Sequence, residues 1–136
     1  MRGILLTLGL VLCVAGLGCH STSAPTTTAS SAPPSTTTTF NGTVNVKSSD
    51  TNTFSVSQTG EVDVTLTTTT PASATLGLGL GTGSPCSILA GGSVTAQAGS
   101  TPQLTGKATP GTLCVQVYDP GNDTGPVTYT LTVAHP

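Results

Sequence analysis

Strict alternation of apolar and polar residues constrains the fold of this chain more than any other feature. Val62, Val64 and Leu66 alternate with polar residues, and the segment from Val127 to Val133 shows the same period of two. This period is typical of a strand with one buried face, whereas a helix would show a period near 3.6. Similar short runs recur along the chain between turn residues, and no segment has a helical period.

Seven such runs can be read between residue 40 and the end of the chain. They are 40–46, 53–56, 62–66, 76–80, a weaker 94–98, 113–118 and 127–133, with a turn expected at Ser48–Asp50. Turns every 8–12 residues or so indicate an antiparallel sandwich or barrel. The sequence therefore predicts an all-β fold: a small, jelly-roll-like antiparallel β-sandwich of seven or eight strands in residues 40–136.

Composition narrows the functions open to such a domain. Charged residues make up 6% of the chain and the net charge is −2, which excludes the basic footprint of a nucleic-acid-binding protein. Aromatic residues make up 3% and tryptophan is absent, so a stacking platform for sugars or bases is disfavoured. Threonine is the commonest residue, and its β-branched side chain suits strands.

The N-terminus is typical of an export signal. Arg2 precedes an apolar stretch from Gly3 to Gly18, which is shorter than the 20 or so residues that a membrane span needs. We therefore interpret residues 1–18 as a signal peptide. Gly18 followed by Cys19 resembles the lipobox of bacterial lipoproteins, which implies cleavage before Cys19 and lipidation of its thiol. An ordinary signal peptidase cutting at the same bond is the alternative. His20, rather than Asp, follows the cysteine, and by analogy this predicts an outer-membrane anchor in the cell envelope.

A low-complexity spacer is predicted at residues 19–39. It consists of Thr, Ser, Ala and Pro after His20, with no formal charge and no large apolar side chain. Such a segment cannot bury enough surface to offset the entropy of ordering it. Pro25, Pro33 and Pro34 stiffen it. We expect it to hold the folded domain away from the membrane, and its Thr and Ser residues to be candidate acceptors of O-linked sugars.

Cysteine usage predicts one disulfide. Cys13 would leave with the signal peptide and Cys19 would carry lipid, so Cys86 and Cys114 remain. Two remaining cysteines in an exported chain most often pair. The alternative, a metal site, would need ligand spacings such as CxxC, which the sequence lacks.

Several segments of the predicted domain resemble a known bacterial family. They are Phe54–Val56, Gly60–Leu66, Leu76–Gly81, Gly111–Asp119 and Gly125–Val133. Together they resemble the pre-peptidase C-terminal domain, a jelly-roll-like β-sandwich of secreted proteins. Leu113 stands where a tyrosine is common in that family. Family members are usually appended to secreted peptidases or other hydrolases, and this sequence holds no such domain.

Three groups of residues are candidate chemical sites. The glycines from Gly77 to Gly83 lack the spacing of a phosphate loop, and we interpret them as a strand whose glycine face lets another backbone approach. Glu61 and Asp63 share one face of a strand and are expected to face solvent. Asp119, Asn122 and Asp123 offer oxygen ligands for a weak Ca²⁺ site, as in collagen-binding relatives of the fold, although the same residue types simply favour turns.

Catalysis is not predicted. His20 lies in the spacer and His135 is one residue from the C-terminus, so both are expected outside the domain core. No GxSxG motif or triad spacing is present, and no cofactor is expected apart from Ca²⁺. We therefore predict a non-catalytic envelope lipoprotein, held to the membrane by its lipid, whose sandwich binds an unknown extracellular protein or polysaccharide. A structural lipoprotein without a dedicated ligand, or a secreted accessory domain, are the alternatives.

Overall fold

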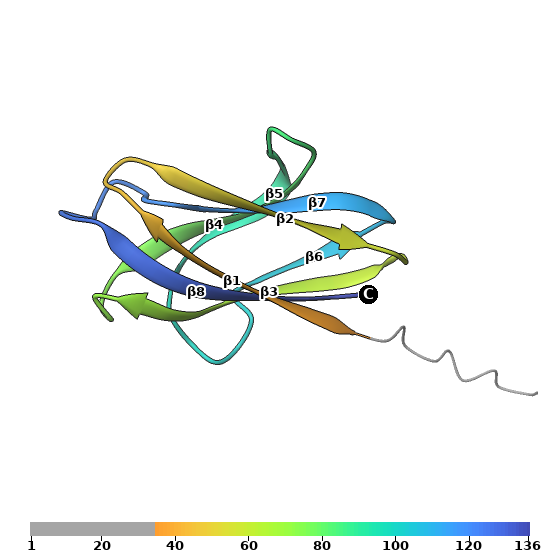
Figure 1. Cartoon of the computed structure of the whole chain (residues 1–136), viewed down its shortest axis with the longest axis horizontal. Helices are drawn as coiled ribbons and strands as arrows, with labels where there is room; N and C mark the ends of the chain where they lie inside the picture. The colour runs from red at the N-terminus through yellow and green to blue at the C-terminus, as the bar shows by residue number, and fades with distance from the viewer. Residues whose placement is uncertain (1–34) are drawn as a thin grey trace, which may run out of the picture. The chain divides into compact units, whose positions relative to one another are not determined.

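Two four-stranded antiparallel sheets form the domain (Figure 1). The computed structural model describes residues 35–136, and this part of the chain contains no helix. One sheet, here called sheet A, has the order β1-β8-β3-β6, and the other, sheet B, has the order β2-β7-β4-β5. The strands of sheet A are β1 (Thr36–Val44), β8 (Val127–His135), β3 (Gly60–Thr70) and β6 (Leu104–Ala108). Those of sheet B are β2 (Ser49–Val56), β7 (Gly111–Tyr118), β4 (Thr75–Thr82) and β5 (Ser87–Gln97).

The strand pairing is nested about the middle of the domain. β4 pairs with β5, β3 with β6, β2 with β7 and β1 with β8, as in one long hairpin folded at the β4–β5 turn. Two further pairings, β3 with β8 and β4 with β7, roll this hairpin into two sheets. Such wrapping is that of a jelly roll. The predicted fold class, an all-β jelly-roll-like sandwich of up to eight strands, is confirmed.

The core lies between the inner faces of the two sheets and follows from the alternation seen in the sequence. In sheet A, Val62, Val64 and Leu66 are fully buried, and Leu131 and Val133 of β8 lie beside them. The leucines of β4 face them from sheet B and are at most 1% exposed. Burying each such side chain stabilises the fold by about 1.5–3 kcal/mol before entropy is subtracted.

The glycines of β4 lie on the outer face of sheet B, where neighbouring side chains cover them. A Cβ at Gly77 would overlap the ring of Tyr118, and one at Gly79 would meet Ile88. Only at Gly81 is the nearest atom a backbone atom, the carbonyl oxygen of Ser87. The expected strand is therefore present, but two of these three glycines make room for side chains rather than for another backbone.

Three strand boundaries and one whole strand differ from the expectation. β5 begins at Ser87, before the weaker run expected at 94–98. β1 begins at Thr36, four residues before Phe40, because these threonines pair with the end of β8. β2 begins at Ser49, so Ser49 and Asp50 lie in a strand rather than in the expected turn. β6 was not predicted, since its sequence LTGKA buries only Leu104 and Ala108. The predicted signal peptide and residues 19–34 of the predicted spacer lie outside the described residues.

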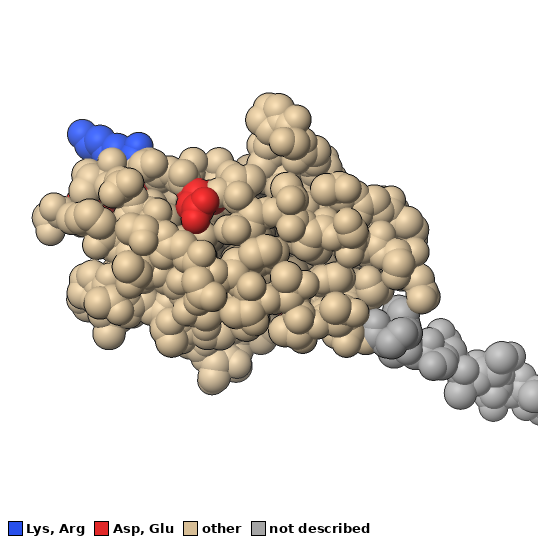
Figure 2. Space-filling model, viewed as in Figure 1, with Lys and Arg blue, Asp and Glu red and all other residues tan. Residues whose placement is uncertain are grey.

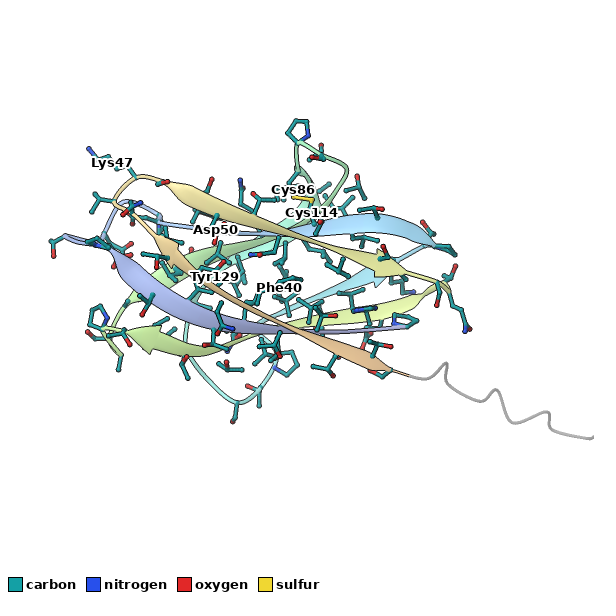
Figure 3. All side chains as sticks on the ribbon, viewed as in Figure 1. Phe40, Lys47, Asp50, Cys86, Cys114 and Tyr129 are labelled. Carbon is teal, nitrogen blue, oxygen red and sulfur yellow. A yellow bond between two sulfur atoms is a disulfide. The ribbon has the colours of Figure 1, made fainter. Side chains whose placement is uncertain are left out.

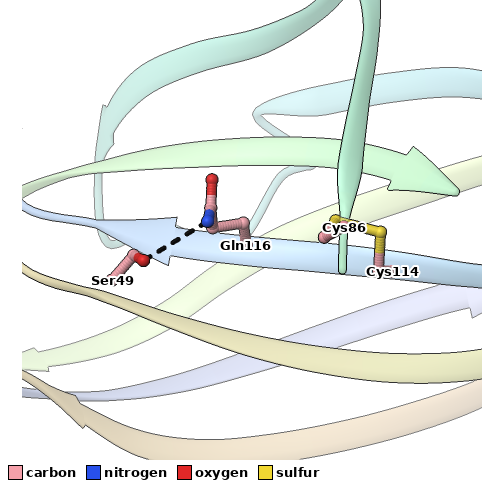
Figure 4. The surroundings of a disulfide bond; sticks show 4 residues. All are labelled: Ser49, Cys86, Cys114 and Gln116. Carbon is pink, nitrogen blue, oxygen red and sulfur yellow. Dashed lines mark hydrogen bonds between the residues drawn. A yellow bond between two sulfur atoms is a disulfide. The ribbon is translucent and has the colours of Figure 1, made fainter. Parts of the chain in front are cut away.

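A disulfide joins the β4–β5 turn of the long hairpin to β7, within sheet B. Cys86, just before β5, is bonded to Cys114 of β7, with a Cα–Cα distance of 5.7 Å (Figure 4). In the strand register, Gly81 of β4 lies between the two strands that carry the bridge, and a Cβ there would approach the Cys86 sulfur. The predicted pairing of Cys86 with Cys114 is what the structure contains.

We predict that removing this bridge lowers the stability of the sandwich. The Cys86→Ser/Cys114→Ser variant should lose roughly 3–4 kcal/mol of unfolding free energy, because the unfolded chain is no longer closed into a loop. Urea unfolding of the oxidised protein, the reduced protein and the variant would measure it. Ser84→Ala, in the same turn, is the control and should unfold like the wild type. Equal stability of the oxidised and reduced proteins would contradict the prediction.

Candidate functional site

The loops at one end of the sandwich converge on Asp119, directly after β7. Its Oδ2 accepts a hydrogen bond from the backbone N–H of Lys47 at 2.8 Å, and its own N–H donates to the carbonyl of Ser48 at 3.0 Å. Its Oδ1 accepts three N–H groups from the loop that follows, those of Gly121 (2.7 Å), Asn122 (3.2 Å) and Asp123 (3.3 Å). Asp119 therefore fixes the β7–β8 loop and ties it to the β1–β2 loop.

The charges of Asp119 and Asp123 respond to this arrangement in opposite directions. The N–H group of Lys47, and then those of Gly121, Asp123 and Asn122, lower the pKa of the Asp119 carboxyl against a smaller effect of burial. Burial, and then repulsion from Asp119, raise the pKa of Asp123. The Oδ2 atom of Asp123 is buried and has no hydrogen-bond partner among the described residues.

The structure thus brings together two of the three side chains predicted for a Ca²⁺ site. Both Asp119 oxygens already accept backbone N–H groups, which is the use of Asp in a turn. Asn122 contributes its backbone N–H and is itself exposed. Residues 35–136 contain no cluster of three or more His, Cys, Asp or Glu side chains that could hold a metal. The geometry favours the turn over the metal site, which stays a prediction to test.

A second polar cluster joins the two sheets beside this end and was missed by the sequence reasoning. Tyr129 of β8 is 3% exposed; its hydroxyl donates to Asp50 Oδ2 at 2.7 Å and accepts from Asn52 Nδ2 at 2.9 Å. Figure 3 shows Tyr129 and Asp50 facing each other across the sandwich. A side chain at Gly42 would overlap both groups. The sequence does hold a signal for this cluster: Tyr129 stands among the apolar positions of the alternating run 127–133. Because a buried hydroxyl needs a hydrogen-bond partner, a polar residue opposite it could have been expected.

This cluster is suited to holding the sheets together rather than to acid–base chemistry. Burial, and then the hydrogen bond to Asp50, raise the pKa of the Tyr129 hydroxyl far above neutrality, so it remains a protonated donor. A protonated hydroxyl can donate to Asp50 and accept from Asn52 at the same time, so both hydrogen bonds between the sheets are kept. The cluster is therefore a structural tie between β8 and β2.

His135 was expected outside the core, and that expectation was wrong. It is 6% exposed, because β8 continues to His135 and pairs there with Thr36. Its ring packs against Phe54, with centroids 5.0 Å apart, and Nε2 lies 3.2 Å from the Thr38 hydroxyl. Its Nδ1 lies 3.3 Å from the main-chain oxygen of Pro136, so both ring nitrogens have a polar neighbour in this buried position.

Two acidic residues of β3 and one small hollow are the other surface features considered as sites. Glu61 is exposed and Asp63 is half-buried, on the outer face as predicted, and Asp63 accepts a hydrogen bond from the Thr105 hydroxyl at 2.9 Å. A half-open hollow of about 180 Å³ lies between Leu89 and the β6–β7 turn at Pro110. Typical small-molecule sites measure about 300–1,000 Å³, so it is small for a ligand pocket. Cys19 lies outside the described residues.

Comparison with known proteins identifies no relative of this chain. No family model, no curated protein and no solved structure matches the chain. The resemblance to the pre-peptidase C-terminal domain therefore stays a prediction. The described residues also contain no helix with the length and hydrophobicity to cross a membrane.

Opposite pKa shifts at Asp119 and Asp123 give opposite predictions for stability against pH. The lowered pKa of Asp119 means that its ionised form stabilises the fold above the ordinary value of 3.8, and that this stabilisation is lost as pH falls towards the folded pKa. Asp119→Asn should therefore lower Tm at pH 7 and flatten its fall in acid. The raised pKa of Asp123 means that its charge destabilises the fold at neutral pH, so Asp123→Asn should raise Tm there.

Thermal unfolding between pH 3 and pH 7 would measure both effects, and shifts of the same sign would contradict the assignment. The same melts with millimolar Ca²⁺ test the metal. We expect no change, since N–H groups occupy Asp119; a rise in Tm that Asp123→Asn abolishes would instead establish the Ca²⁺ site.

Proposed function

We propose that this protein is a non-catalytic, lipid-anchored bacterial envelope protein whose β-sandwich is an interaction module for an extracellular protein or polysaccharide. The anchor at Cys19 and export through the signal peptide rest on the sequence. The role in display is supported by one observation: two loops lie at the end of the sandwich opposite the point where the chain enters it.

The chain enters the sandwich at Thr36, which pairs with His135 near the C-terminus. β1 then runs nine residues, about 30 Å, to the opposite end. There lie the β1–β2 loop with Lys47 and the β7–β8 loop, joined through Asp119 (Figures 1 and 3). A domain tethered through its N-terminus would therefore present this distal loop end, defined as residues 45–48 and 119–126, away from the membrane.

The distal loop end has the character of a recognition surface on a rigid scaffold. Loops carry binding residues most often where strands hold them in place. Here one side chain, Asp119, accepts four backbone N–H groups and fixes both loops. Lys47 and Asn122 remain exposed beside it. This arrangement supports binding through hydrogen bonds and one positive charge rather than through apolar burial.

Lipidation is the first test of the proposal. In a bacterial host, the wild-type chain should incorporate a labelled fatty acid and fractionate with membranes, whereas Cys19→Ser should do neither. The reason is that the Cys19 thiol is the only group that the proposed lipobox presents for acylation. A Cys13→Ser variant is the matched control and should behave like the wild type. Unlabelled wild-type protein would contradict the anchor and leave an ordinary signal peptide.

Two lysines offer a matched test of the binding surface. Lys47 lies at the distal loop end. Lys107 of β6 lies opposite Glu61 of β3 in the strand register, near the end where the chain enters the sandwich. Both side chains are exposed. Residues 35–136, immobilised, would be screened on glycan arrays and in pull-downs from envelope extracts. Lys47→Glu should lower the affinity for a captured ligand severalfold, whereas Lys107→Glu should leave that affinity unchanged.

The outcomes separate the candidates. If only Lys107→Glu lowered the affinity for the ligand, the proposal that the distal loop end binds it would be contradicted. A screen without any ligand would contradict the interaction module. Altered detergent sensitivity of a deletion strain would then identify a structural envelope lipoprotein.

A further inference from the structure

Four strands of the described sandwich have one unpaired edge: β1 and β6 in sheet A, and β2 and β5 in sheet B. An open edge presents free N–H and C=O groups on which another strand can pair. Natural proteins protect such edges with short strands, charged side chains, prolines or bulges. The four edges differ sharply in these devices.

Three of the edges are protected. β6 has five residues and carries the exposed Lys107. β5 is interrupted where its register with β4 shifts between Gly79 and Gly81, and Gly91 there has a φ of +72°. β2 carries the charged Asp50. Each of these features opposes regular pairing with a further strand.

β1 carries none of these devices. It is nine residues long, its sequence TTTTFNGTV contains no charge and no proline, and its register with β8 runs without a break from Thr36 to Val44. Gly42, near the end of β1, leaves no gap, because Tyr129 and Asp50 occupy the space beside it. β1 is thus the regular, uncharged open edge of the described sandwich.

The surface around β1 matches this description. Figure 2 shows a face that is almost free of charge, with basic atoms at one end and acidic atoms nearer its middle, and the labels in Figure 3 place Lys47 and Asp50 at these positions. Phe40, at the centre of β1, packs against the core but is only partly buried. An aromatic ring at the middle of an uncharged edge would gain by being covered.

We propose that β1 pairs with β1 of a second copy of this chain, antiparallel and about a two-fold axis at Phe40. In that register the two Phe40 residues lie opposite each other and Thr37 of each copy lies opposite Thr43 of the other. No charges are opposed, and the two four-stranded A sheets become one eight-stranded sheet. A second copy is the fitting occupant because self-pairing about a two-fold axis closes, so no edge of the same kind is left for polymerisation.

The dimer is expected to be weak. A nine-residue edge is about 30 Å long, and pairing along it buries an area at the low end of specific interfaces. We therefore expect a dissociation constant on the order of 1 µM to 1 mM.

Sedimentation equilibrium of residues 35–136 over about 1 µM to 1 mM tests the proposal, because that range spans weak interfaces. Both sheets, the core and the disulfide lie within this segment. Thr37→Lys/Thr43→Lys would oppose lysines across both ends of the pair and should weaken dimerisation about tenfold. Thr37→Lys/Thr43→Glu would oppose unlike charges instead and should dimerise at least as well as the wild type, more so at low salt.

A matched control is Thr68→Lys/Thr70→Lys, which adds the same charge to exposed threonines on the outer face of β3, where they lie opposite Thr130 and Thr128 of β8 rather than on β1. It should leave the dissociation constant within about twofold of the wild type, allowing only for net charge at a distance. Wild-type protein that stays monomeric throughout, or a dimer indifferent to both β1 variants, would overturn the proposal. Loss of the dimer in both β1 variants would contradict the antiparallel register. Slower hydrogen exchange in β1 at high concentration, with β5 and β6 unchanged, would support it.

Discussion

The pairing of β8 with both β1 and β3 is the interaction on which the rest of the structure depends. β8 comes last in the chain, yet it lies inside sheet A and joins the first strand to the third. Until it is in place, β1 has no partner and Val64 and Leu66 of β3 have no neighbour on that side. The nested pairs link residues almost 100 positions apart, so the fold depends on contacts whose loop-closure entropy is large.

Two local ties compensate for what a small aliphatic core provides poorly. The buried core consists mainly of eight valines and seven leucines, with Phe54 and Tyr129 as its buried aromatic residues, and a domain of this size buries a limited share of its surface. The hydrogen bonds of Tyr129 to Asp50 and Asn52 join the sheets at one end. The Cys86–Cys114 bridge fixes the turn of the long hairpin to β7. Each tie also fixes register, because a slip of one residue would turn Tyr129 outward.

The sequence predicted those parts of the fold where one face alternates without interruption. Val62–Leu66 and Val127–Val133 are visible because every second residue is large and buried. β6 was not predicted because its two buried residues are four positions apart, too few to show an alternation. It forms because it pairs with β3. Asp50 resembled a turn residue, and only the distant Tyr129 explains its place in a strand. Of the site, the cysteine pair was predicted by counting, whereas the link between Asp119 and Lys47 depends on two loops 72 residues apart.

Low charge links the two proposed surfaces of this molecule. An almost uncharged domain gains little from electrostatic steering, so its encounters with a partner are slow unless the partner is held nearby. The proposed membrane anchor would provide that proximity, because tethered copies would share a thin layer in which their effective concentration is high. Under that condition an interface too weak to matter in dilute solution can be populated. Dimerisation through β1 would leave residues 45–48 and 119–126 uncovered, but the antiparallel pairing points the two distal loop ends in opposite directions. In a tethered pair, one copy would therefore present its loops away from the membrane and the other towards it, so the dimer changes the direction of display rather than doubling the valency on one side.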